Sequence, residues 1–250
     1  MADKGNDFYV GYLALPPRLR WTIRGLVVLL VSLIAFDAWL VATLQPEAGD
    51  GRWAETPREF VGTLARNPYP TLRVMEDGAS RTFVIVSDEK RGAEAALAAI
   101  PDGASVRIQG YEVERAAVGM IQLAATAQDV APSDTPAVPD APREIHGGRT
   151  LEGEIVDSKC WLGVMRPGDG HIHKACASIC IRGGIPPMFV TREGGDTPPV
   201  MLLTRLDGSA VPPDAILAYV ADRVRLTGVV EKRGDISIFK ADMASLSRAE

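Results

Sequence analysis

The stretches SVRIQGYEVER (residues 105–115) and RVRLTGVVEKR (residues 223–233) decide the fold, because the second repeats the pattern of the first at an offset of 118 residues. In both stretches apolar and polar residues alternate, which is typical of a strand with one buried face. Both have a glycine in the sixth place, Gly110 and Gly228, where a sharply coiled or bulged strand uses one. The repeat therefore predicts two copies of one β-domain.

The order of elements around the repeated strand indicates the architecture of each copy. A short apolar strand follows it (residues 120–123 and 236–239), a short helix precedes it (93–100 and 214–220), and strands lie further upstream (59–64 and 82–86; 151–156 and 200–204). This succession of strands, a helix and two strands is that of an OB-fold, a small Greek-key barrel. We predict a mainly β protein with OB-like barrels at residues 52–128 and 148–250, joined by a proline-rich linker at 129–147.

Residues 25–44 (GLVVLLVSLIAFDAWLVATL) contain a single charge and predict a transmembrane helix. At about 1.5 Å per residue they make about 30 Å of helix, which crosses a bilayer core. Basic residues precede the segment and acidic residues follow it, so the positive-inside rule places an N-terminal arm (1–24) in the cytoplasm and the barrels in a bacterial periplasm. We expect a single-pass protein of the bacterial inner membrane. A cleaved signal peptide is the alternative, although its apolar region usually has only about 7–15 residues.

Two features of the N-terminal part predict a partner in the membrane. Asp37 lies inside the apolar stretch, and a carboxylate in lipid usually faces another helix or a polar cavity, unless it stays protonated or draws water inward. The leader before the stretch is aromatic and punctuated by prolines, and we expect Tyr9 and Tyr12, with Trp39 of the helix, to contact a partner subunit or the membrane surface. The expected partners are therefore other integral membrane subunits and the lipid bilayer.

Charge and motif content exclude several classes of function. The chain has 27 Lys and Arg residues against 32 Asp and Glu residues, a formal net charge of −5. Phosphate binding needs a basic surface, so we expect no nucleic acid partner. No Ser-His-Asp arrangement, phosphate-binding loop or HExxH motif is recognisable in the sequence.

The residues suited to metal or redox chemistry fall in one short segment. All three cysteines and two of the three histidines lie between residues 160 and 180. They belong to an insert, residues 157–186, between the first two predicted strands of the second barrel, on the usual binding side of an OB topology. Within it, residues 173–181 predict about two helical turns that end at a Gly-Gly pair. His173, Cys176 and Cys180 are spaced three and four apart and therefore share one helix face.

The insert resembles a motif of bacterial exported proteins of uncharacterised function. The pattern is roughly G-x-I-x-D-S-K-C, a short loop, H-x-x-C-A-x-x-C, then G-G and an apolar strand, and about forty residues of the second domain match it (VDSKCWLGVM…GHIHKACASICIRGGIPPMFV). Cys160, His173, Cys176 and Cys180 fall on the pattern, and His171 is additional. The resemblance implies a genuine module in this domain and implies no activity.

Three kinds of site fit this cluster of Cys160, His171, His173, Cys176 and Cys180. An extracytoplasmic compartment favours a disulfide from Cys160 to Cys176 or Cys180, which leaves one cysteine over. Three thiolates with His173 are alternatively a ligand set for zinc or copper, and a cluster without any cofactor is equally compatible with the sequence. Thiol catalysis is the third kind, with Lys159 or His173 lowering a thiol pKa.

The functional prediction combines the anchor and the insert. We predict a membrane-anchored periplasmic accessory subunit of a membrane-bound, respiratory or redox complex, which is not itself catalytic. The alternative is a periplasmic protein that binds zinc or copper, or transfers electrons, through Cys160, His173, Cys176 and Cys180. A thiol-redox protein is the third prediction.

Overall fold

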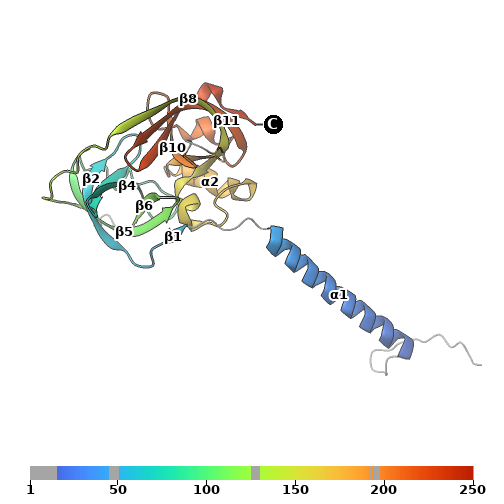
Figure 1. The fold of residues 1–250 in the computed structure, drawn as a ribbon. Coiled ribbons are helices and arrows are strands. Elements are labelled where there is room, and N and C mark those ends of the chain that lie inside the picture. Colours follow the sequence, from blue (N-terminus) through green and yellow to red (C-terminus); the bar gives the residue numbers. More distant parts are fainter. Residues whose placement is uncertain (1–15, 45–50, 125–129, 192, 194–197, 250) are drawn as a thin grey trace, which may run out of the picture. The chain divides into compact units, whose positions relative to one another are not determined.

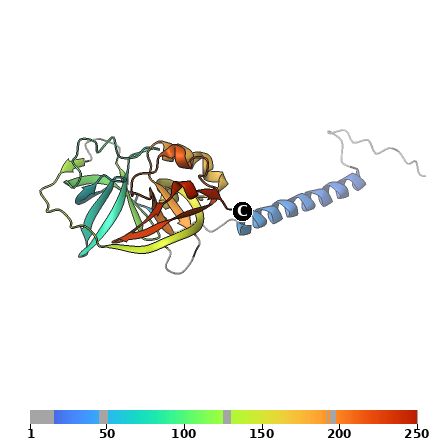
Figure 2. The same ribbon diagram turned by 90° about the horizontal axis from the view of Figure 1, so that it is seen from above.

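A computed structural model describes residues 16–44, 51–124, 130–191, 193 and 198–249. The chain divides into two compact units, residues 1–47 and 48–250. The first unit contains α1 (Pro17–Leu44) and the second contains all the strands (Figures 1 and 2). The predictions of a mainly β protein, of two small barrels and of one apolar N-terminal helix are confirmed.

Helix α1 is long and apolar enough to cross a bilayer. It has 28 residues, none of them buried, and its most apolar part has a mean hydropathy of 2.4. The helix begins at Pro17, where proline's fixed φ suits a first helical position, so it starts before the predicted span of 25–44. Membrane anchors and signal sequences share these properties.

The first barrel has five strands in the order β2-β3-β4-β6-β5, and β5 pairs again with β2. Its strands are β2 (Arg58–Ala65), β3 (Thr71–Glu76), β4 (Ala79–Val86), β5 (Ser105–Arg115) and β6 (Val118–Leu123). Strands β4 and β6 are parallel, and the other neighbours are antiparallel. Two short strands, β1 (Arg52–Trp53) and β7 (Val130–Pro132), pair with β5 from outside the barrel.

The second barrel repeats this arrangement with the order β8-β9-β10-β12-β11, and β11 pairs again with β8. Its strands are β8 (Arg143–Asp157), β9 (Pro187–Thr191), β10 (Val200–Arg205), β11 (Arg223–Arg233) and β12 (Ile236–Ala241). Here β10 and β12 are the parallel pair. The short strand β13 (Ser247–Arg248) continues from the 3-10 turn Met243–Ser245 and pairs with β11.

The repeated glycines lie where each long strand passes from one neighbour to the next. Gly110 of β5 pairs with both β2 and β6, and Gly228 of β11 pairs with both β8 and β12. A Cβ at Gly110 would lie 2.6 Å from the carbonyl oxygen of Gln122, and one at Gly228 would lie 2.3 Å from that of Lys240. The glycines therefore allow the close approach that closes each barrel.

The predicted helices before β5 and β11 are wrong in extent. Residues 93–100 form consecutive turns, in which the Leu97 amide bonds to the Ala93 carbonyl but the next bonds span three residues. The second prediction, 214–220, contains only α3 (Pro213–Ile216). Both segments are too short for helical propensity alone to stabilise a full helix. Their conformation is determined by packing, because apolar side chains such as Leu97 and Ile216 are buried in the barrel cores.

The two barrels share a buried core. Tyr69, Val84 and Met120 of the first barrel pack in one cluster with Met188 and Ile238 of the second. The Tyr69 hydroxyl donates to the carbonyl of Leu203 at 3.0 Å and accepts from the amide of Val211 at 2.9 Å. Burial is the main reason that the pKa of Tyr69 is raised. The barrels are thus one packed unit.

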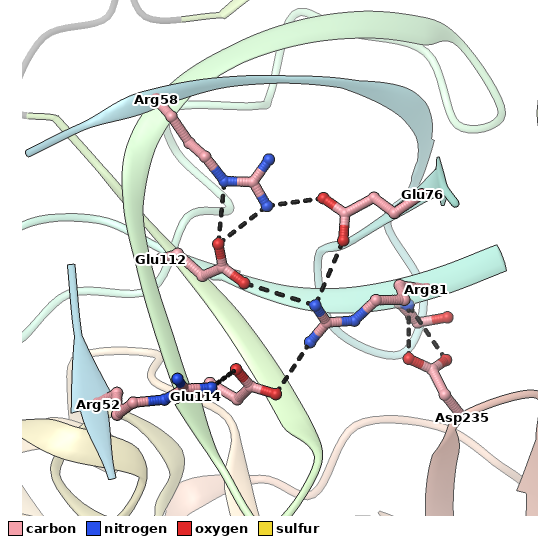
Figure 3. A network of polar contacts seen from close by, with 8 residues as sticks. Arg52, Arg58, Glu76, Arg81, Glu112, Glu114 and Asp235 are labelled. Carbon is pink, nitrogen blue, oxygen red and sulfur yellow. Dashed lines mark hydrogen bonds and ion pairs between the residues drawn. The ribbon is translucent and has the colours of Figure 1, made fainter. Parts of the chain in front are cut away.

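A further polar contact crosses this junction, beside an ion-pair network of the first barrel. Figure 3 shows a network on the first barrel in which Arg58 and Arg81 bind the carboxylates of Glu76, Glu112 and Glu114. Next to it the carboxylate of Asp235, in the turn between β11 and β12, accepts the amide of Thr82 at 3.0 and 3.1 Å.

The segment assigned to a proline-rich linker, 129–147, is described from residue 130 onward, and this part packs along the first barrel before it enters the second. Strand β7 lies on β5, and the amide of Val138 donates to the Thr63 hydroxyl at 2.7 Å. Arg73 donates to the Val138 carbonyl and pairs with Asp140. Strand β8 begins at Arg143, inside the segment, and bends across into the second barrel.

Candidate metal centre

The first part of the candidate site is the end of β8. The strand ends at Asp157, and the next residues, Ser158, Lys159 and Cys160, are all buried. Buried polar groups are costly without a partner; Asp157 and Lys159 have hydrogen-bond partners, whereas the hydroxyl of Ser158 has none among the described residues. The chain then makes one wide turn, Cys160–Val164, whose Trp161 and Leu162 side chains pack into the core shared by the two barrels.

The second part of the site is helix α2 (Lys174–Arg182), preceded by a 3-10 turn, His171–His173. Cys176 and Cys180 lie four residues apart and share the helix face that packs against β8 and the shared core. The helix ends at Arg182 with Gly183 as its C-cap, and the next residue, Gly184, has a positive φ of 93° that favours glycine. The amide of Ile185 bonds to the carbonyl of Cys180 and fixes the end of the helix.

The structure brings the three cysteine thiols together. Their sulfur atoms all lie within 4.8 Å of one another, and the Sγ atoms of Cys160 and Cys176 are 3.9 Å apart. All three cysteines are free. Cys160 and Cys180 are buried, while Cys176 is partly exposed. The cluster is therefore a nearly closed thiol site with one accessible member.

Neither histidine of the predicted cluster joins the group of three sulfurs, although His173 lies within 4.8 Å of the Cys160 sulfur. His173 is buried and its Nε2 atom lies 2.9 Å from Oδ2 of Asp157, whose Oδ1 accepts the amide of Cys160 at 2.9 Å. His171 is exposed and lies 3.7 Å from Asp222. Among the described residues, no imidazole lies within 4.8 Å of all three sulfurs; His173 instead forms a second group with Asp157 and Cys160.

Two lysines border the thiols, and sequence reasoning identified only one of them. Lys90, from the first barrel, lies with its Nζ atom 2.7 Å from Sγ of Cys176 and 3.8 Å from Sγ of Cys180. Lys159 points away, because its Nζ atom donates to the carbonyls of Ser87 and Glu89 at 2.9 and 2.6 Å. Burial lowers the pKa of Lys159.

Hydrogen bonding within the cluster separates the thiol pKa values. The pKa of Cys180 is lowered, first because it accepts a hydrogen bond from Cys160 and also because Lys90 is near. The pKa of Cys160 is raised above its usual range, because its proton is held in that hydrogen bond and because the thiol is buried beside Asp157. Within this pair the thiolate is therefore favoured on Cys180 and the proton on Cys160.

The residues predicted to contact a membrane partner belong to the first unit. Asp37 and Trp39 are exposed along α1, and Trp39 stacks obliquely on Phe36 with 5.9 Å between ring centroids. Tyr9 and Tyr12 lie outside the described residues.

Comparison with known proteins adds no assignment to this site. No protein-family model, no curated protein and no solved structure matches the chain.

Proposed function

We propose that the chain is a membrane-anchored protein that binds a soft metal ion, Cu(I) in first place, through Cys160, Cys176 and Cys180. The observation that carries the proposal is the convergence of three sulfur atoms within 4.8 Å of one another. They come from two separate segments, the end of β8 and helix α2, and packing holds both segments in place. Thiolates are the ligands that soft metals such as Cu(I) and zinc prefer.

The spacing of the sulfurs suits a common ligand shell. With metal–sulfur bonds of about 2.3 Å, two thiolates in a trigonal plane around one ion lie about 4.0 Å apart. The 3.9 Å between Cys160 and Cys176 agrees with that spacing. A disulfide would use two of the three sulfurs and leave the third without a role, so the metal accounts for more of the arrangement.

The ligand count favours Cu(I) over zinc. Structural zinc sites have four protein ligands in almost every case, and the fourth in the predicted set was His173. The Nε2 atom of His173 is instead engaged with the carboxylate of Asp157. Three thiolates without an imidazole match the low coordination number of Cu(I), whereas zinc would need water or another molecule as its fourth ligand.

The residues around the sulfurs have distinct roles in this proposal. Asp157 is a positioning residue, because its carboxylate holds the backbone of Cys160 and the ring of His173 at the same time. The partly exposed Cys176 is the thiol that an arriving ion meets first. Binding releases thiol protons, so affinity rises with pH.

The proposal includes the fold and the location. Both barrels have an OB-like strand order, in which the third and fifth strands are parallel and the fourth closes on the first. Helix α1 supplies the membrane anchor, and Arg18, Arg20 and Arg24 near its start support a cytoplasmic N-terminus and periplasmic barrels. The resemblance of the insert to a motif of bacterial exported proteins supports the same compartment.

A role as accessory subunit of a membrane complex is the second candidate. Asp37 favours it, because this ionisable side chain lies within an apolar helix that has no buried residue, seven residues before the helix ends at Leu44. Such a residue in lipid is most stable against a polar group of a neighbouring helix. Substitution of Asp37 by Leu would release partners that copurify in detergent, whereas the metal site would not change.

Copper content of the full-length protein tests the main proposal. The protein is purified in mild detergent with reductant and without oxygen, loaded with Cu(I) and freed of excess metal by a competing chelator. We expect one copper per chain, and a loss of bound copper in Cys160→Ser, Cys176→Ser and Cys180→Ser. The matched control is His171→Ala, which removes an exposed histidine of the same insert and should bind one copper. The proposal fails if the wild type retains no copper or if the three serine variants retain it.

A further inference from the structure

Lys90 belongs to the first barrel but lies at the thiol cluster of the second. Its Nζ atom contacts Sγ of Cys176 at 2.7 Å and Sγ of Cys180 at 3.8 Å. The lysine is 86 residues away from Cys176 in sequence, so only the packing of the two barrels creates this contact.

The backbone that carries Lys90 is fastened to the second barrel on both sides. Before it, the carbonyls of Ser87 and Glu89 accept hydrogen bonds from the buried Lys159. After it, the amide of Gly92 donates to the carbonyl of Gly183 at 2.9 Å, just beyond α2. The backbone of Lys90 is thus held by several contacts, in a place from which its ammonium group reaches two of the sulfurs.

We propose that Lys90 makes the site selective for monovalent soft metal ions over divalent ones. This inference rests on the proposed function. Three thiolates with Cu(I) carry a net charge of −2, whereas the same thiolates with Zn(II) carry −1. The Cu(I) complex is more negative by one unit whatever the protonation state before binding. A fixed cation next to the sulfurs therefore stabilises the Cu(I) complex more.

The expected size of the effect follows from the position of the charge. Lys90 is exposed, so solvent and salt screen its interaction with the site. The two complexes differ by one unit of charge, and a unit charge about 4 Å away interacts with this difference more weakly in water than near a protein surface. We expect the ratio of Cu(I) affinity to Zn(II) affinity to fall about tenfold when the charge is removed.

The experiment measures both affinities for the full-length protein in detergent, with chromophoric chelators as competitors. Lys90→Met and Lys90→Gln should lower the Cu(I)-to-Zn(II) affinity ratio about tenfold, and Lys90→Arg should keep it. Lys232→Met, at an exposed lysine of β11, is the matched control and should leave the ratio unchanged. The effect should shrink at high ionic strength, which a merely structural role would not produce.

The outcomes separate this inference from the proposed function. If the wild type binds neither ion, the proposed function fails and selectivity has no basis. If the wild type binds Cu(I) but the ratio is the same in Lys90→Met and Lys90→Gln, the metal site stands and the role of Lys90 is refuted. A ratio lowered equally in Lys90→Arg would also refute it, because the charge is then not the cause.

Discussion

Replacement of Asp157 by alanine tests whether this carboxylate holds the site together. Asp157 is fully buried, and its two oxygens bind the amide of Cys160 and the ring of His173, each at 2.9 Å. Alanine leaves both of these buried polar groups without their partner. Each unpaired buried group costs about 1–3 kcal/mol, so we expect a loss of about 4 kcal/mol of unfolding free energy. For a folded unit of about 200 residues this lowers Tm by about 10 °C.

The assay is thermal unfolding of the full-length protein in detergent, followed by near-ultraviolet circular dichroism. Asp157→Asn keeps one carbonyl acceptor and should lose about half as much stability as Asp157→Ala. Asp134→Ala is the matched control, because Asp134 is exposed, and its Tm should stay within about 2 °C of the wild type. A Tm for Asp157→Ala within that same interval would refute the positioning role of the carboxylate.

Three further substitutions probe the junction and the pH dependence. Tyr69→Phe removes a hydroxyl that bonds two backbone groups of the second barrel, and should cost about 1–3 kcal/mol in urea unfolding. Gly183→Ala places a Cβ 1.9 Å from the carbonyl oxygen of Lys90, so it should weaken Cu(I) binding in chelator competition. Gly148→Ala should not, because its Cβ would meet only the carbonyl oxygen of Gly228, at an ordinary contact distance of 4.0 Å. Burial alone would raise the pKa of Asp222, but its hydrogen bonds from two basic side chains lower it. Asp222 therefore stabilises the fold above its unfolded pKa of about 3.9, and this stability is lost as pH falls through the lower folded pKa. The urea midpoint of Asp222→Asn should be below that of the wild type at pH 7 and converge with it near pH 2.

The barrels were predictable because their pattern is local. Alternation over eleven residues marks β5 and β11, and the same offset of 118 also relates β6 (Val118–Leu123) to β12 (Ile236–Ala241). The helix predicted at 93–100 failed, because an alanine-rich segment of eight residues has high helical propensity but too little length to keep a helix.

The candidate site was predictable only in part. The spacing of Cys176 and Cys180 on one helix face is a local property, and the structure has it. His173 is on that face by spacing, yet the buried carboxylate of Asp157 engages it, which no sequence period reveals. Nothing in the sequence indicated that Lys90 lies at the thiol cluster, because its contact with Cys176 depends on how the two barrels pack.

X-ray absorption at the copper edge is the most direct test of the proposed thiolate site. The full-length protein, loaded with one Cu(I) per chain under reductant, should show three sulfur neighbours at about 2.3 Å and no nitrogen neighbour. Cys176→Ser loses copper to a competing chelator, but with one equivalent of Cu(I) and no chelator present it should show two sulfur neighbours. A spectrum dominated by nitrogen or oxygen neighbours, or one that Cys176→Ser leaves unchanged, would contradict the account.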